Sequence, residues 1–98
     1  MNRRIRFTPS AKEQLDNLMR YIASDSPSAA RDFKSEILAK LENLCTFPEM
    51  GRRIPEYPND EFRELIIKKY RFFYTLEGST IWIVGIWRGS QIPGRPTY

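Results

Sequence analysis

Residues 70–87, YRFFYTLEGSTIWIVGIW, decide the fold of this chain. Tyr70 to Leu76 is strongly aromatic, and aromatic residues favour a β-strand. LEGST follows, and Gly78 within it indicates a hairpin turn. Thr80 to Trp87 is apolar on both faces, which is typical of a central strand that is covered on both sides. This stretch therefore predicts two strands, joined by a hairpin, in the middle of a sheet.

Two more strands are predicted elsewhere in the chain. Arg4 to Thr8 alternates between polar and apolar residues, as a short half-buried strand does. Phe62 to Lys69 alternates in the same way. In the aromatic strand, the same rule places alternate residues on opposite faces. One face carries Tyr70, Phe72 and Tyr74, and the other carries Arg71, Phe73 and Thr75.

Two amphipathic helices are predicted after the first strand. The first helix begins either at Thr8–Pro9 or at Ser10, where Glu13 completes a capping box. Ser26–Pro27 separates the helices by a short turn, so they are expected to fold back on each other. Their apolar stripes consist of Ala11, Leu15, Leu18, Met19 and Ile22, and of Ala30, Phe33, Ile37, Leu41 and Leu44.

The order of these elements predicts a single α+β domain over residues 1–98. Residues 47–60, FPEMGRRIPEYPND, are rich in proline and are predicted to form a loop. The arrangement is then β-α-α-β-β-β, with the helical hairpin packed on one face of a mostly antiparallel four-stranded sheet. Residues from about 90 to 98 are predicted to form an extended tail. The tail, a second copy or a partner protein is expected to cover the second face.

The composition limits the chemistry that we expect. The 98 residues include one cysteine, Cys45, and no histidine. The usual general base and metal ligand near neutral pH are therefore missing, and we expect neither a metal nor a cofactor. No apolar run is long enough to span a membrane, and the first residues do not form a secretory signal. We therefore expect a cytoplasmic protein.

The net charge of +4 is unevenly distributed. Basic residues concentrate in the first and last segments, where strands are predicted, which indicates an anionic partner at the sheet. Lys68, Lys69, Arg71 and Arg88 are expected to meet near one end of the sheet, where an arginine fork suits a phosphate. Alternatively, these cations simply face solvent and the aromatic residues form the core. A cluster of carboxylates is interpreted as a solvated turn: Asp60, Glu61 and Glu64.

The sequence as a whole resembles the RelE/ParE superfamily of toxins from bacterial type II toxin–antitoxin systems. The resemblance covers roughly residues 5 to 89. It is carried by TPSAKEQLDNLMRYIA, SPSAARDF, FPEMGRR, FRELIIKKYRFFYTL and STIWIVGIWRG, in this order. The helical part and FPEMGRR are most similar to the ParE branch. In this resemblance Arg71 matches an arginine of the third strand, and Arg88 approximates one of the last strand.

The resemblance implies a partner and a target. An antitoxin encoded by a neighbouring gene is expected to lay a helix and an extended segment over the toxin, which forms a hetero-oligomer. ParE-like members inhibit DNA gyrase and so block replication, and this is the leading hypothesis, without a catalytic site. The expected target or anion contacts are Arg63, Lys68, Lys69, Arg71 and Arg88. The expected antitoxin contacts are Leu15, Leu18, Met19, Ile22, Trp82 and Trp87.

Two alternatives stay open at this point. A RelE-like ribonuclease cuts messenger RNA on the ribosome, which needs proton transfer and stabilisation of the phosphate charge. In this chain its residues are expected to be Arg71, Arg88, Lys68, Lys69 and Tyr98. The other alternative is an inactive module that only binds its antitoxin.

Overall fold

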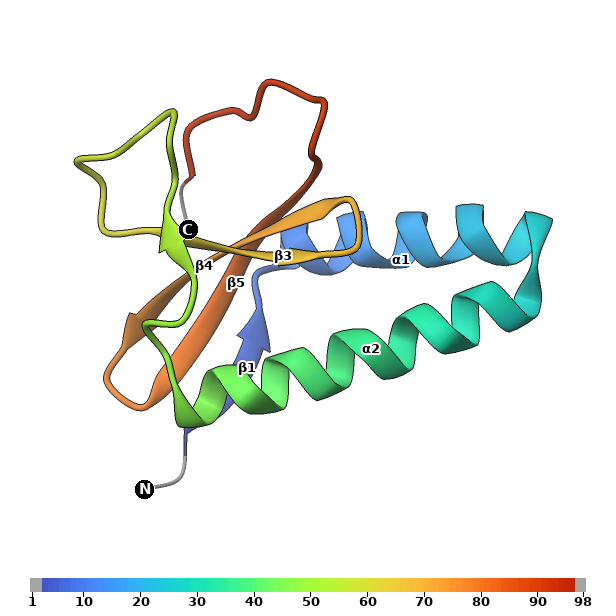
Figure 1. Cartoon of the computed structure of the whole chain (residues 1–98), viewed down its shortest axis with the longest axis horizontal. Coiled ribbons are helices and arrows are strands. Elements are labelled where there is room, and N and C mark those ends of the chain that lie inside the picture. Colours follow the sequence, from blue (N-terminus) through green and yellow to red (C-terminus); the bar gives the residue numbers. More distant parts are fainter. Residues whose placement is uncertain (1–2, 97–98) are drawn as a thin grey trace.

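The computed structural model describes residues 3–96, and within them the predicted α+β architecture is confirmed. Two helices pack on one face of a five-stranded mixed sheet (Figure 1). The elements, in chain order, are β1 (Arg4–Phe7), α1 (Pro9–Asp25), α2 (Pro27–Thr46), β2 (Arg52–Arg53), β3 (Arg63–Ile67), β4 (Tyr70–Glu77) and β5 (Thr80–Arg88).

The helical hairpin begins and turns at residues that cap helices. Thr8 is the N-cap of α1, because its Oγ1 accepts a hydrogen bond from the Ala11 amide at 3.3 Å. This decides between the two predicted starts in favour of Thr8. Ser26 caps α2 in the same way, with its Oγ accepting from the Ala29 amide at 3.2 Å. The two helices therefore run side by side across the sheet (Figure 1).

The sheet differs from the prediction in two ways. Its strand order is β1-β5-β4-β3-β2, and β1 pairs with β5 in parallel, with Arg4 opposite Thr80. The prediction of four strands is wrong because Arg52–Arg53 pairs with β3 inside the segment that was predicted to be a loop. A two-residue strand is too short for an alternating pattern, and alternation alone does not give the direction of β1.

The turns of the sheet also refine the prediction. Gly78 has a φ of 60° in the turn between β4 and β5, as a tight turn of this kind requires. Lys68 and Lys69 were predicted to end a strand, but they form the turn between β3 and β4. Lys68 has a φ of 53°, a left-handed conformation that few residues other than glycine adopt.

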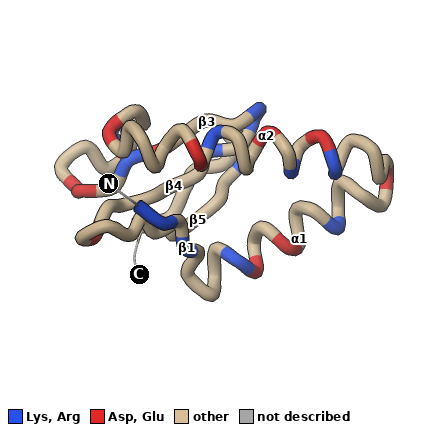
Figure 2. The backbone as a smooth tube through the Cα atoms, turned by 90° about the horizontal axis from the view of Figure 1, so that it is seen from below, with Lys and Arg blue, Asp and Glu red and all other residues tan. Residues whose placement is uncertain are grey.

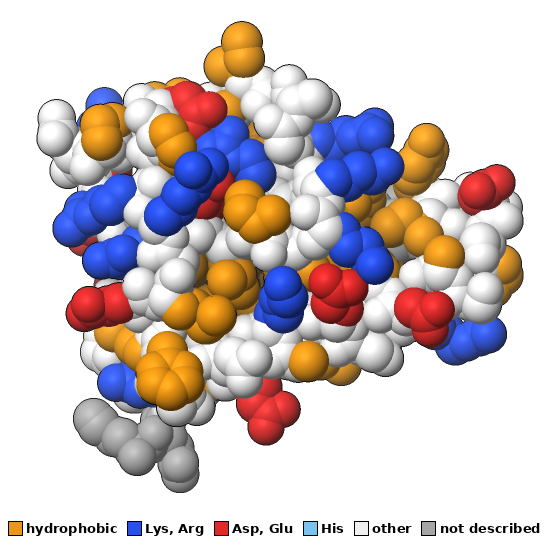
Figure 3. Space-filling view, viewed as in Figure 1, with side chains coloured by type: hydrophobic (Ala, Val, Ile, Leu, Met, Phe, Trp, Pro, Cys, Tyr) orange, Lys and Arg blue, Asp and Glu red, His pale blue; other side chains and the backbone are white. Residues whose placement is uncertain are grey.

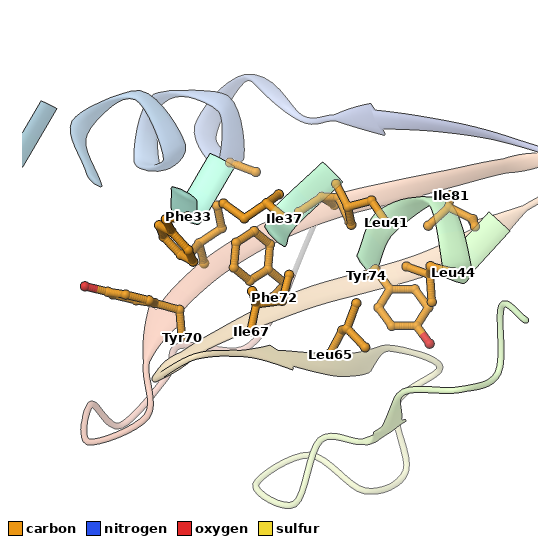
Figure 4. Packing of buried hydrophobic residues seen from close by; sticks show 13 residues of the cluster. Phe33, Ile37, Leu41, Leu44, Leu65, Ile67, Tyr70, Phe72, Tyr74 and Ile81 are labelled. Carbon is orange, nitrogen blue, oxygen red and sulfur yellow. The ribbon is translucent and has the colours of Figure 1, made fainter. Parts of the chain in front are cut away.

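The main core lies between the sheet and the helices. Tyr70, Phe72 and Tyr74 of β4 point toward the helices, as the alternation predicted, and Phe33 of α2 packs against Tyr70 with ring centroids 5.4 Å apart (Figure 4). A smaller cluster occupies the opposite face of the sheet. It consists of Ile54, Phe62, Phe73 and Val84, with Tyr57, Trp82 and Trp87 packed against it.

The second face is covered by the chain itself. The covering loop, residues 54–61, and the tail, residues 89–96, lie next to each other over this face (Figure 1). The Tyr57 hydroxyl donates to the Pro93 carbonyl at 2.8 Å, and Arg95 forms an ion pair with Asp60 at 2.8 Å. Pro93 is fully buried. The tail, one of the three expected covers, therefore lies over this face, and the covering loop holds it in place.

Candidate functional site

Three of the predicted basic residues meet at one end of the sheet. The turn between β3 and β4 carries Lys68 and Lys69, and the Lys69 carbonyl accepts a hydrogen bond from the Gly89 amide at 2.8 Å. This bond brings the end of β5, with Arg88, beside the turn; Arg88 also pairs in register with Tyr70. We call Lys68, Lys69 and Arg88 the basic turn surface. The fourth cation of the predicted cluster, Arg71, lines a pocket with Lys69 and Arg88.

The basic turn surface lies beside the helical hairpin. The Lys68 ammonium forms an ion pair with Glu36 of α2 at 3.1 Å, and both side chains are partly exposed. Figure 2 marks the basic and acidic positions along the backbone of the helices and the sheet. Within residues 3–96, the Lys69 and Arg88 side chains have no hydrogen-bond or ion-pair partner. These two cations are therefore available to an anionic group from outside the chain.

Arg71 has a different environment from the other cations. It faces away from the helices, as predicted, but it is only 5% exposed, so the alternative that it faces solvent is wrong. Its guanidinium contacts Glu64 at 2.6 Å and Glu56 at 2.6 Å, and it lies over the Phe73 ring at 5.3 Å. Its planar fork is already occupied by carboxylates of the same chain.

Glu64 is the anion around which this network is built. It was interpreted as part of a solvated turn, and this is wrong: its side chain is fully buried, between Arg71 and Arg52. Arg52 of β2 contacts the Glu64 carboxylate at 3.2 Å and is itself largely exposed. A buried carboxylate needs such cations because an unpaired charge away from water is very costly.

The ion pairs change the protonation behaviour of the groups involved. Hydrogen bonds from the Arg71 guanidinium lower the pKa of Glu56 below its ordinary value of 4.5, although partial burial opposes this shift. Hydrogen bonds to Glu56 and then to Glu64 raise the pKa of Arg71 further above its ordinary range. Arg71 is therefore a permanent cation, and Glu56 beside it is an anion near neutral pH.

Two other predicted site residues lie away from the basic turn surface. Arg63 is at the start of β3, at the end of this strand opposite to Lys68, and its Nη1 donates to the Gly51 carbonyl at 2.8 Å. Its partner across the sheet in β2 is Arg53. Tyr98, a residue of the ribonuclease alternative, lies outside the described residues.

A groove runs between α1 and α2. It has a volume of about 700 Å³, and Leu15 and Met19 of α1 line it together with Ile37, Leu38 and Leu41 of α2. Leu38 is 59% exposed and lies beside the other apolar lining residues of the groove, so it adds to a contiguous apolar surface. The groove is therefore a surface that a hydrophobic partner segment fits.

The charges along the groove are mostly positive. In the described part of the chain, its charged lining residues are one acid and four bases: Asp16, Lys12, Arg20, Arg31 and Lys34. Lys12 forms an exposed ion pair with Asp16 at 2.8 Å. The groove thus presents an apolar floor with a basic rim, which complements an amphipathic segment that carries acidic residues.

The predicted antitoxin contacts divide among three places. Leu15 and Met19 lie in the groove. Leu18 and Ile22 lie on the side of α1 that faces the sheet end and pack against the main core. The two tryptophans belong to the smaller cluster under the covering loop and the tail: Trp82 and Trp87.

The comparisons with known proteins identify the family. A family model described as the ParE toxin of the type II toxin–antitoxin system parDE matches residues 5–93 of the chain. The chain belongs to the ParE toxin family. A solved structure titled as the chromosomal ParDE TA system from P. aeruginosa has a similar fold, with a TM-score of 0.69 and 20% sequence identity, covering 90% of this chain and 96% of that chain. The comparison with curated proteins gave no match.

Membership of the ParE family agrees with the resemblance noted in the sequence and implies an antitoxin partner. Among residues 3–96, no helix is long and apolar enough to cross a bilayer. Sequence reasoning missed the two residues that bind Arg71, Glu56 and Glu64, and it missed the contribution of α2 to the groove. The available signal for the groove was Leu38, an apolar residue outside the predicted stripe of α2.

Proposed function

We propose that this ParE toxin inhibits DNA gyrase in the cytoplasm, and thereby blocks replication. The match of the ParE family model over residues 5–93 carries the proposal. In this proposal the toxin acts by binding gyrase and not through a hydrolytic site of its own. The engagement of Arg71 by two carboxylates supports this view, because the residue expected to hold a phosphate is already neutralised.

We also propose that the cognate antitoxin neutralises the toxin through the groove between α1 and α2. An amphipathic helix would place its apolar side on Leu15, Met19 and Leu38 and its acidic side against the basic rim. Toxin and antitoxin then form a stable hetero-oligomer. The antitoxin is expected to be the small protein encoded by a gene next to that of the toxin.

Two assays on one preparation of the purified toxin test the proposed target. In the first assay, gyrase introduces supercoils into relaxed plasmid; in the second, ribosomes translate a defined message. The proposal predicts that excess toxin stops supercoiling and traps a cleaved DNA complex, while the message stays intact. Codon-specific cleavage of the message with unaffected gyrase would support the ribonuclease alternative. If the toxin neither inhibits gyrase nor cleaves the message, and its expression does not harm cells, the alternative of an inactive antitoxin-binding module is supported.

A further inference from the structure

We propose that the basic turn surface is the part of the toxin that contacts its target, and that it binds an acidic protein surface. This inference rests on the proposed function, since it assigns the contact through which gyrase inhibition occurs. The sequence predicted a wider set of basic contacts. Arg63 lies at the other end of β3. Arg71 lines a pocket with Lys69 and Arg88, but it is buried and paired with Glu64 and Glu56.

The three cations form one continuous surface with two exposed apolar side chains. Lys69 and Lys68 line a pocket of about 740 Å³ together with Tyr21 at the end of α1. Lys69 and Arg88 line a second pocket with Ile66 and the paired Arg71, and Arg88 lines a third with Tyr21. The three pockets therefore adjoin, because each shares a residue with the next.

The exposed apolar side chains favour a protein as the partner. Tyr21 is 70% exposed and Ile66 is 43% exposed, although each is large enough to be buried in a core. Basic and hydrophobic side chains stand next to each other on the face in Figure 3. Tyrosine and arginine dominate the binding energy of protein interfaces, where apolar anchors are surrounded by polar groups.

The charge count argues against a nucleic acid. Four cations border the three pockets, but Arg71 is paired with Glu56 and Glu64. Lys68 is partly neutralised by Glu36, and Asp25 lines the same pocket as Lys68. Binding to duplex DNA rests largely on many Lys and Arg contacts to phosphates, on the order of 6–10 in a strongly salt-dependent complex. Lys69 and Arg88 can instead form ion pairs with one or two carboxylates of a protein partner. These ion pairs would lie at the edge of the hydrophobic contact made by Tyr21 and Ile66.

The target surface and the antitoxin groove are separate. No residue that lines the groove also lines any of the three pockets beside the basic turn surface, within the described residues. The groove opens between α1 and α2, whereas the basic turn surface joins the tip of the helical hairpin to the sheet end. Mutations can therefore disable one surface without the other.

The test compares two double variants with the same change of charge. K69E/R88E reverses the two unpaired cations of the basic turn surface, and R31E/K34E reverses two cations on the rim of the groove. Each variant is titrated into the gyrase supercoiling assay and into a binding assay with the antitoxin from the adjacent gene. Circular dichroism on heating checks that both variants fold, and K69Q/R88Q replaces the first variant if it does not.

The inference predicts that K69E/R88E raises the toxin concentration for half inhibition of gyrase at least tenfold, because it sets like charges against the target carboxylates. Its antitoxin affinity should stay within twofold of the wild type. R31E/K34E should show the opposite pattern, with weaker antitoxin binding and unchanged gyrase inhibition.

Equal gyrase inhibition by the wild type and a folded K69E/R88E would overturn the inference and leave the proposed function intact. The wild type is also tested with a fluorescent DNA duplex in the absence of gyrase. Binding that K69E/R88E loses would overturn the inference that the partner of this surface is a protein. A wild type that does not inhibit gyrase would overturn the proposed function as well.

Discussion

The residue type at position 71, an arginine, does not by itself tell what this side chain contacts or does. Strand alternation placed it correctly on the face opposite Phe72, but alternation does not tell whether a cation on that face meets water or a carboxylate. Its two partners are distant in sequence, since Glu64 precedes it by seven residues and Glu56 by fifteen. We conclude that Arg71 stabilises the fold and fixes the covering loop.

Removing the Arg71 charge should destabilise the protein strongly. Arg71→Met leaves the buried Glu64 carboxylate with only the exposed Arg52 as a partner, and breaking a buried ion pair in this way costs about 3–5 kcal/mol. Urea unfolding measures the loss. The matched control is Arg88→Met, which should change the free energy of unfolding by no more than about 0.5 kcal/mol.

The double variant Arg71→Met/Glu64→Leu should recover much of this loss, because it removes the buried charge together with its partner. Similar unfolding free energies for Arg71→Met and Arg88→Met would contradict the internal network.

Gly51 is a second residue with a specific role, because the surrounding atoms leave no room for a side chain at this position. A Cβ at this position would stand 2.5 Å from the Glu64 carbonyl oxygen and 2.6 Å from the Tyr74 hydroxyl. The same hydroxyl accepts a hydrogen bond from the Gly51 amide at 3.0 Å and donates to the Pro48 carbonyl at 2.7 Å. Burial raises the pKa of Tyr74, so this phenol stays protonated and keeps donating.

Gly51→Ala should therefore lower the free energy of unfolding by at least about 2 kcal/mol, through overpacking and loss of the buried hydrogen bond. Gly78→Ala is the control, because nothing lies within 4 Å of its added Cβ and only its φ of 60° is unfavourable. We expect about 1 kcal/mol for this second substitution. Thermal unfolding of both variants measures the difference, and a larger loss at Gly78 would be incompatible with the close packing described at Gly51.

At the scale of elements, the covering loop is held to the sheet and to the tail by two ion pairs. Arg71 holds Glu56, and Arg95 of the tail holds Asp60, whose pKa is lowered by the Arg95 hydrogen bonds. Carboxylates with a lowered pKa stabilise the folded state above their ordinary pKa, and this contribution is lost as the pH falls through the folded pKa. Acid should therefore weaken the attachment of the loop.

Glu56→Gln should reveal this dependence in the melting temperature. Because the pKa of Glu56 is lowered from 4.5, the wild type should melt at a higher temperature than the variant at pH 6 and above. The difference should shrink as the pH falls below about 4.5 and disappear when Glu56 is protonated in both states. Glu42→Gln, at an exposed glutamate without an ion pair in the described chain, is the control for the loss of one carboxylate. A constant difference from pH 3 to 7 would rule out the proposed role of this pair.

The elements also show what the sequence can predict. Both helices, their caps at Thr8 and Ser26, and the central hairpin follow from local rules of spacing, capping and turn formation. β2 does not follow from these rules. Two residues are too few to show an alternating pattern, and β2 forms only because it pairs with β3, about ten residues further along the chain. The parallel direction of β1 is likewise a property of the whole sheet.

The candidate site was predicted less well for a related reason. The meeting of Lys69 and Arg88 could be expected, because both stand where predicted strands end. The burial of Glu64 and the groove on α2 could not, because each depends on side chains from several elements and no local pattern records them.

At the scale of the whole molecule, the proposed antitoxin groove and the proposed target surface share no lining residue in the described part of the chain. If the antitoxin helix binds in the groove as proposed, Leu15→Glu should weaken antitoxin binding at least tenfold, because it sets a carboxylate on the apolar floor. Glu42→Gln again serves as the control, and isothermal titration calorimetry measures both affinities. An unchanged affinity of folded Leu15→Glu would place the antitoxin elsewhere on the toxin.

The most direct test of the central claim is a titration of the wild-type toxin into purified gyrase with relaxed plasmid and ATP, in which supercoiled and cleaved plasmid are quantified on a gel. We predict that supercoiling stops and cleaved plasmid accumulates as the toxin concentration rises, and that prior mixing with the antitoxin restores supercoiling. Unchanged supercoiling at excess of a folded toxin that still binds its antitoxin would contradict the claim.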